Sequence, residues 1–257
     1  MRGGPLAEQF DRLSEVYDAT RSPPEDALAD AVVNGLRSRG IASVLEIGVG
    51  TGRIALPLRA RGLGVVGVDA SAHMLARARA KGLPDLVRGD AYRLPFRAAA
   101  VDATLFVHVL HLLEDPVTAL REACRVGRTG AVALVRPSPG EGPDPTADSA
   151  PGPDRLVAEI LTEQGHPTRA AGAGPRRGEA RLLALAPPDH LDVLSDRLVT
   201  ERLSERLDFI GRGASRRFLD VPPEALAWAV AEARARLGDR EVSFRSIEAL
   251  ATWSRPP

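Results

Sequence analysis

Hydrophobic residues follow two alternating patterns along the first half of the chain. Short apolar runs rich in valine alternate with longer stretches whose apolar positions recur every three to four residues. The first pattern predicts buried strands, and the second predicts amphipathic helices. The alternation therefore predicts an α/β protein built on a mostly parallel sheet. The predicted strands are 43–47, 64–69, 86–91 with its exit loop, 101–108 and 131–135, and the predicted helices are 52–61, 71–81 and one that begins at Asp115-Pro116.

The two ends of the chain have a less regular pattern. Residues 1–40 predict two short helices, and Tyr17 lies on the apolar face of the first. Residues 137–153 are rich in proline and glycine, which predicts a long loop. Beyond this loop, the pattern predicts helices at 154–165, 179–186, 201–212 and 222–237, and strands at 191–199 and 242–253.

The first strand runs into three glycines at alternate positions, Gly48, Gly50 and Gly52. Glycine suits a tight turn in which the backbone takes unusual dihedral angles or lies against a ligand. The turn follows the carboxyl end of a strand, where open α/β sheets bind ligands. In a dinucleotide fingerprint the third glycine would come one residue later, at the position of Arg53. Glu46 lies within the strand, where a carboxylate would meet a cation better than a pyrophosphate.

The second strand ends in a carboxylate, Asp69. A carboxylate at this point of a βαβ unit can accept hydrogen bonds from both hydroxyl groups of a ribose. The alternative is that Asp69 caps the helix that begins near Ser71. The pattern thus favours a nucleoside ligand and does not identify which one.

The stretch from Glu46 to Gly52, Glu-x-Gly-x-Gly-x-Gly, resembles motif I of the class I S-adenosylmethionine-dependent methyltransferases. The junction from Asp69 through Ala70 to Ser71 has the form common in that family. The sequence Gly-Asp-Ala-Tyr-Arg-Leu-Pro-Phe at 89–96 resembles its motif II. The resemblance is specific over 42–136, weak beyond, and is to the methyltransferase type 11 branch related to quinone-biosynthesis and other small-molecule enzymes.

The resemblance implies a Rossmann-like three-layer sandwich with a seven-stranded sheet in the order 3-2-1-4-5-7-6 and an antiparallel last strand. It implies one domain over 1–257. Within it, 1–40 would be a helical lid, 41–136 the cofactor-binding core, and 137–257 the acceptor-side insertions, with a helical cap, and the C-terminal strands. The loop after the fifth strand borders the acceptor in related enzymes.

The resemblance also implies S-adenosylmethionine as the cofactor and direct in-line methyl transfer to a small-molecule acceptor. Glu46 and the glycine loop would hold the methionine end, and Asp69 with Ala70 the ribose. An acceptor-only carboxylate suits the exocyclic amine of adenine, which assigns Asp90 and Ala91 to that ring. The implied cofactor-binding residues are Tyr17, Glu46, Gly48, Gly50, Gly52, Asp69, Ala70, Asp90, Ala91 and Val107.

Two histidines follow the fourth strand. His111 is a candidate proton shuttle on the acceptor side, because imidazole titrates near neutral pH. The alternative is that His111 only lines the pocket or caps a helix. His108 is interpreted as a buried strand residue or a wall of the pocket.

Composition narrows the possible partners. The chain has 257 residues, a formal net charge of +0 and one cysteine, Cys124. A neutral chain has no general attraction for nucleic acid or for an anionic membrane. No apolar run approaches the length of a membrane span. We therefore expect a cytoplasmic protein, monomeric or homodimeric, that binds no nucleic acid, no membrane and no metal.

Three other functions remain open from the sequence. A degenerate methyltransferase fold can serve as a non-catalytic, cofactor-binding partner subunit. An NAD(P)-dependent oxidoreductase is disfavoured by the early third glycine. A methyltransferase acting on RNA is disfavoured by the neutral charge.

Overall fold

The computed structural model describes residues 8, 10–11, 14, 17–18, 26–137, 153–168, 179, 182–213, 216–218 and 220–254. The predicted loop 137–153 lies outside these residues except for its two ends, as do most of the first predicted helix and residues 180 and 181 of the predicted helix 179–186. The chain forms two compact units, one over 1–138, 173–196 and 247–257 and the other over 139–172 and 197–246.

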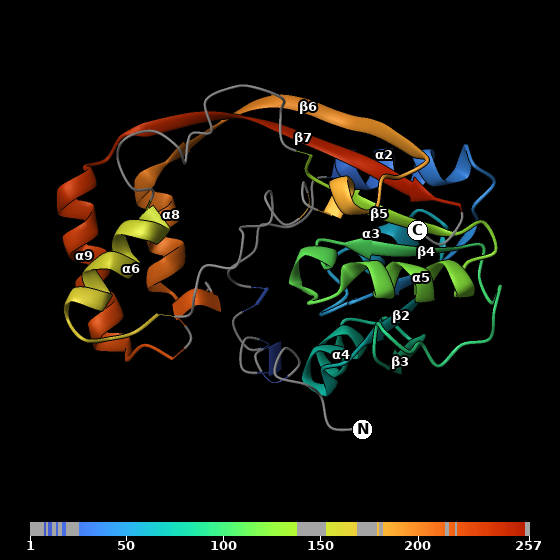
Figure 1. The fold of residues 1–257 in the computed structure, drawn as a ribbon, viewed down its shortest axis with the longest axis horizontal. Coiled ribbons are helices and arrows are strands. Elements are labelled where there is room, and N and C mark those ends of the chain that lie inside the picture. Colours follow the sequence, from blue (N-terminus) through green and yellow to red (C-terminus); the bar gives the residue numbers. More distant parts are fainter. Residues whose placement is uncertain are drawn as a thin grey trace. The chain divides into compact units, whose positions relative to one another are not determined.

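A seven-stranded sheet organises the first unit, with the strand order β3-β2-β1-β4-β5-β7-β6 (Figure 1). The inner pairs β1–β2, β1–β4, β2–β3 and β4–β5 are parallel, whereas β5 and β7 pair antiparallel. The predicted strand order and reversed last strand are confirmed. The strands are β1 Ser43–Ile47, β2 Gly64–Asp69, β3 Leu86–Arg88, β4 Ala103–Val107, β5 Ala131–Val135, β6 His190–Arg202 and β7 Glu241–Trp253.

The order of the strands reverses direction at β1, which has β2 on one side and β4 on the other. In open α/β sheets, the crevice for ligands forms at the carboxyl ends of the strands at such a switch point. Asp102 fixes the opposite end of these strands. Its carboxylate accepts hydrogen bonds from the backbone N–H groups of Ala42 and Ser43 at 3.0 and 2.9 Å, and from Arg128 at 2.7 Å.

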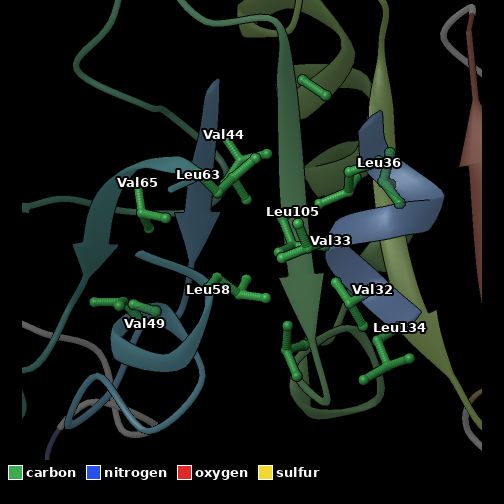
Figure 2. Packing of buried hydrophobic residues seen from close by; sticks show 14 of the residues in the cluster. Val32, Val33, Leu36, Val44, Val49, Leu58, Leu63, Val65, Leu105 and Leu134 are labelled. Carbon is green, nitrogen blue, oxygen red and sulfur yellow. The ribbon is translucent and has the colours of Figure 1, made fainter. Parts of the chain in front are cut away.

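Strands β1, β4 and β5 are buried on both faces of the sheet, which explains why they are apolar at successive positions. Val44 and Leu105 belong to one core cluster, whereas their chain neighbours Leu45 and Phe106 belong to a second. The first cluster includes residues of α2 Asp26–Arg37, α3 Ala55–Ala60 and α4 Ala72–Ala80, and the second includes residues of α5 Pro116–Val126. The unit therefore has three layers, and Figure 2 shows side chains of α2 directed toward β4 and β5.

Local sequence signals explain most of the element boundaries. Ser71 caps α4 by accepting a hydrogen bond from the backbone N–H of Met74, and Asp115 caps α5 in the same way through Thr118. The helix after the glycine turn was predicted to start at residue 52, but α3 starts at Ala55. The reason is that Gly52 still has a left-handed φ of +76°.

The prediction differed most from the structure where β6 meets the next helix. The strand was predicted over 191–199 and the helix over 201–212, but β6 continues to Arg202 and α8 covers Leu203–Gly211. The extra length comes from pairing with β7, where the hydroxyls of Thr200 and Ser243 lie 2.8 Å apart. Side-chain pattern alone does not reveal such a partner.

The second unit has a core of its own. Its helices are α6 Pro153–Glu163, α8 and α9 Pro223–Leu237, which contribute Val157, Leu207 and Ala229 to a shared apolar cluster. Asp154 and Arg206 join α6 to α8 through two hydrogen bonds of 2.8 and 2.9 Å. The predicted helices at 154–165, 201–212 and 222–237 are therefore present with small shifts in their bounds, and they pack on one another.

Candidate functional site

A cavity of about 580 Å³ opens at the carboxyl ends of β1, β2 and β4 in the first unit. Its lining comes from the glycine turn, from the residues that follow β2 and β3, and from the end of β4. The cavity thus lies at the switch point of the sheet. Eight of the predicted cofactor residues line it, namely Tyr17, Gly48, Gly50, Asp69, Ala70, Asp90, Ala91 and Val107.

The glycine turn presents backbone rather than side chains to this cavity. Gly48 and Gly50 have φ values of +74° and +56°, in the left-handed region that favours glycine. A Cβ atom on Gly48 would lie 2.6 Å from Cγ2 of Val109, so no side chain fits there. Gly52 does not line the cavity. It packs against α4, where a Cβ atom would lie 3.5 Å from that of Ala78.

Asp69 connects the turn after β1 to the start of α4. One carboxylate oxygen accepts the backbone N–H of Gly50 at 2.8 Å, and the other accepts that of Ser71 at 2.8 Å. The cap of α4 is therefore Ser71, and Asp69 is not its N-cap. Burial raises the pKa of Asp69 against these hydrogen bonds. Each carboxylate oxygen has a second lone pair, which leaves Asp69 able to accept two ribose hydroxyls.

Glu46 lies inside β1, beneath the turn. It is only 2% exposed and does not line the cavity. Burial raises its pKa to about 8, against the attraction of Arg53 and with the added repulsion of Asp69. Among the described residues, its Oε2 has no hydrogen-bond partner. A buried carboxyl oxygen without a partner fits a cationic ligand group such as an α-ammonium.

The loop after β3 supplies the far wall of the cavity. Asp90 is exposed, and its Oδ1 accepts the backbone N–H of Tyr92 at 2.9 Å. The hydroxyl of Tyr92 in turn accepts the N–H of Asp115 at 3.2 Å, which ties this loop to the start of α5. Asp90 therefore has acceptor capacity left for a ligand amine.

Two acidic residues connect the N-terminal segment to the site. Asp18 accepts the hydroxyl of Thr51 at 2.7 Å and pairs with Lys81 at 2.5 Å. Asp11 accepts a hydrogen bond from the hydroxyl of Ser71 and lies 3.1 Å from Nδ1 of His73. Their chain neighbours, Phe10 and Tyr17, line the cavity and make an edge-to-face ring contact with centroids 6.3 Å apart.

His108 and His111 follow β4 and meet the same buried carboxylate, Glu179. Nδ1 of His111 lies 3.4 Å from Oε1 of Glu179, and Nδ1 of His108 lies 3.8 Å from the same oxygen. His108 lines the cavity, whereas His111 does not. Glu179 also accepts the backbone N–H of Arg136 at 2.6 Å. No sequence signal indicates Glu179, because it lies far along the chain in a stretch without a motif.

The described residues were also compared with the requirements of a metal site, a reactive thiol and a membrane-spanning helix. No group of three or more His, Cys, Asp or Glu side chains there is arranged to hold a metal ion. Burial raises the pKa of Cys124 to about 11, so its thiol stays protonated, in line with a structural role. None of the described helices has the length and apolar character needed to cross a membrane.

Comparison with known proteins agrees with this geometry. Residues 45–135 match the methyltransferase domain family. The chain is 35% identical over 136 residues to a demethylmenaquinone methyltransferase from Beutenbergia cavernae, covering 51% of this chain and 56% of the relative. It is 32% identical over 127 residues to a phosphatidylethanolamine N-methyltransferase from Cereibacter sphaeroides, covering 47% and 62%. The chain thus spans a little over half the length of these relatives.

A solved structure extends the likeness in fold to nearly the whole chain. It is a SAM-dependent methyltransferase from Thermotoga maritima, described as a possible histamine N-methyltransferase, with a TM-score of 0.51 and 20% identity. The superposition covers 95% of this chain and 98% of that one, and it supports the fold alone. Sheet order and motif together define the class I S-adenosylmethionine-dependent methyltransferases. This chain has that sheet order, and its residues 45–135 match the methyltransferase domain family.

Proposed function

We propose that this protein transfers the methyl group of S-adenosylmethionine to a small-molecule acceptor. The observation that carries the proposal is one cavity with the glycine turn, Asp69 and Asp90 on its wall. Beneath it lies Glu46, whose Oε2 has no hydrogen-bond partner among the described residues. The ligand that suits this set has a cationic amino-acid end, a ribose and an adenine. When bound, S-adenosylmethionine supplies a methyl group that is already activated by its sulfonium.

Each predicted residue has a defined task in this proposal. Glu46 and the glycine turn hold the methionine end, and Asp69 holds the ribose through its remaining lone pairs. Asp90 accepts the adenine amine while the backbone of Ala91 borders the ring. Tyr17 covers the cavity from the N-terminal segment, beside Phe10. The protein's main contribution to direct in-line transfer is then position and orientation, which suffice for large rate gains.

The acceptor does not follow from the relatives. The two named above act on a quinone precursor and on a phospholipid headgroup, as their names state. The family match ends at residue 135, the last residue of β5, and the predicted loop follows. We infer that the chain works as one methyltransferase domain over 1–257 and that acceptor choice resides in residues 137–257.

Calorimetric titration with S-adenosylmethionine, S-adenosylhomocysteine and NAD tests this proposal. We expect micromolar binding of the first two ligands and none of NAD. Asp69→Asn should weaken binding at least tenfold, because the amide presents donors where the ribose needs acceptors. Asp85→Asn is the matched control, since Asp85 is exposed and forms a surface ion pair with Arg59 at 3.1 Å.

The outcomes separate the alternative functions. Binding of NAD alone would identify an oxidoreductase. Binding of S-adenosylmethionine without transfer to any acceptor would favour a partner subunit. Equal affinity in Asp69→Asn and wild type would contradict the assignment of the ribose site.

A further inference from the structure

A cluster of charged and titratable groups lies where β4 and β5 end. Glu179 is 2% exposed, and its two oxygens face different partners. Oε2 accepts the backbone N–H of Arg136, directly after β5, while Oε1 faces Nδ1 of both His108 and His111. The side chain of Arg136 turns to Glu248 of β7, to which it donates two hydrogen bonds of 3.2 and 3.0 Å.

The two histidines differ in access to the cavity. The side chain of His108 is 21% exposed and lines the cavity. That of His111 is 10% exposed and does not line it. His108 also has a φ of +53°, a left-handed conformation that is uncommon outside glycine. His108 is therefore the histidine of the pair that a bound molecule can reach.

Glu179 is ionised in this setting. Burial alone would raise its pKa, but the histidines and the N–H of Arg136 hold the pKa at about 2. A permanent negative charge at Oε1 favours a proton on the facing Nδ1 atom of His108. Nε2 is then the ring nitrogen left with a lone pair.

We propose, building on the methyltransferase function, that His108 is the general base for an acceptor hydroxyl and that Glu179 is its positioning residue. The substrate class is then a small molecule methylated at an O–H group, whose proton has to leave. An acceptor oxygen that bonds to the methyl carbon would break the bond between that carbon and sulfur, whose electron pair stays on sulfur, so that S-adenosylhomocysteine leaves. The O–H bond of the acceptor breaks as well, and its electron pair stays on oxygen. The proton goes to Nε2 of His108, and the imidazolium that forms is stabilised by Glu179.

The resting charge of His108 suits this role. Burial lowers the pKa of His108, and the positive charge of Arg136 lowers it further, while Glu179 and Glu248 oppose that shift. His111 faces the same oxygen of Glu179. These groups leave the ring neutral at pH 7 and able to accept a proton. The 3.8 Å contact is longer than a hydrogen bond, as is common for catalytic groups without substrate.

The tautomer of His108 tests the arrangement directly. Two-bond ¹H–¹⁵N spectra of histidine-labelled full chain should place the ring proton on Nδ1 at pH 7, with and without S-adenosylhomocysteine. In Glu179→Gln, the amide oxygen stays with the N–H of Arg136 and the amide NH₂ turns to the histidines. The proton of His108 should then move to Nε2. A proton on Nε2 in wild type, or a tautomer unchanged in Glu179→Gln, would overturn the proposal.

Catalysis provides the second test. Radiolabelled S-adenosylmethionine is incubated with a panel of phenols and alcohols. His108→Gln should slow methyl transfer to a hydroxyl acceptor at least 100-fold, within the usual range for a lost general base. His190→Gln, which replaces an exposed histidine at the start of β6, is the control that should leave the rate unchanged. Equal rates in His108→Gln and wild type would overturn the role of His108.

Failure of this proposal can be told apart from failure of the proposed function. Affinity for S-adenosylhomocysteine reports on the cofactor site alone, and the tautomer of His108 reports on the base alone. A chain that binds S-adenosylhomocysteine but carries the His108 proton on Nε2 remains a methyltransferase with a different acceptor chemistry.

Discussion

At the scale of single residues, the site combines groups that the sequence indicates and one that it does not. Gly48, Asp69 and Asp90 were predicted from motif spacing, and all three line one cavity. That was possible because each lies at or just beyond the carboxyl end of a strand, so the fold alone brings them together. Glu179 follows no strand and no motif. Only the folded chain brings it to His108.

The buried carboxyl of Glu46 predicts how the free energy of unfolding changes with pH. Its folded pKa of about 8 lies above the ordinary value of 4.5, so the folded protein binds a proton that the unfolded chain releases. The stability that this provides is complete below pH 4.5 and is lost as pH rises toward 8. Glu46→Gln should remove that slope, which for one proton is about 1.4 kcal/mol per pH unit. Urea unfolding at pH 5 to 8 measures it, with the exposed Glu114→Gln as control.

The same group should couple cofactor binding to pH. A bound α-ammonium favours ionised Glu46, so binding should release a proton. The association constant should then rise up to tenfold per pH unit between pH 6 and 7, below the pKa of an α-amino group. Calorimetry in two buffers of different ionisation enthalpy counts the protons. Glu46→Gln should bind more weakly and release none. Proton release that persists in Glu46→Gln would contradict the role assigned to Glu46.

At the scale of elements, the glycine turn owes its shape to two separate constraints. Gly48 has a left-handed φ of +74° and a space already filled by Val109. Gly40, after α2, has nearly the same φ of +72° and open space around it. An alanine at Gly40 therefore measures the cost of the left-handed backbone alone. The additional cost of an alanine at Gly48 measures the contact with Val109.

Alanine substitution separates these constraints. Gly40→Ala should cost about 1–2 kcal/mol in free energy of unfolding, the usual cost of a left-handed residue with a side chain. Gly48→Ala should cost about 1–3 kcal/mol more through overpacking. Adding Val109→Ala to Gly48→Ala should recover most of that difference. Equal losses in Gly40→Ala and Gly48→Ala would show that the turn does not depend on the contact with Val109.

The elements also show what a sequence pattern can and cannot predict. Strands β1 to β5 were predicted closely, because a strand buried on both faces is a continuous apolar run. The boundary between β6 and α8 was misplaced, because β6 is an edge strand with a mixed pattern. Leu191, Val193 and Leu198 are exposed on it. Its length follows from pairing with β7, which local sequence does not encode.

At the scale of the whole molecule, the chain divides into a sheet unit with the cavity and a helical unit with a separate core. Strands β6 and β7 run through both units, and α8 and α9 lie between them in the chain, whereas α6 precedes β6. The family match covers only 45–135 in the sheet unit. The sequence therefore predicts the strands and helices of 45–135 better than those of the rest of the chain.

The central claim is that the cavity at the ends of β1, β2 and β4 is the cofactor site. The most direct measurement is a crystal structure of the protein with S-adenosylhomocysteine. We expect the ribose at Asp69, the adenine amine at Asp90, and the amino-acid end at the glycine turn above Glu46. Density for the ligand at any other place, or an empty cavity at saturating ligand, would contradict the account.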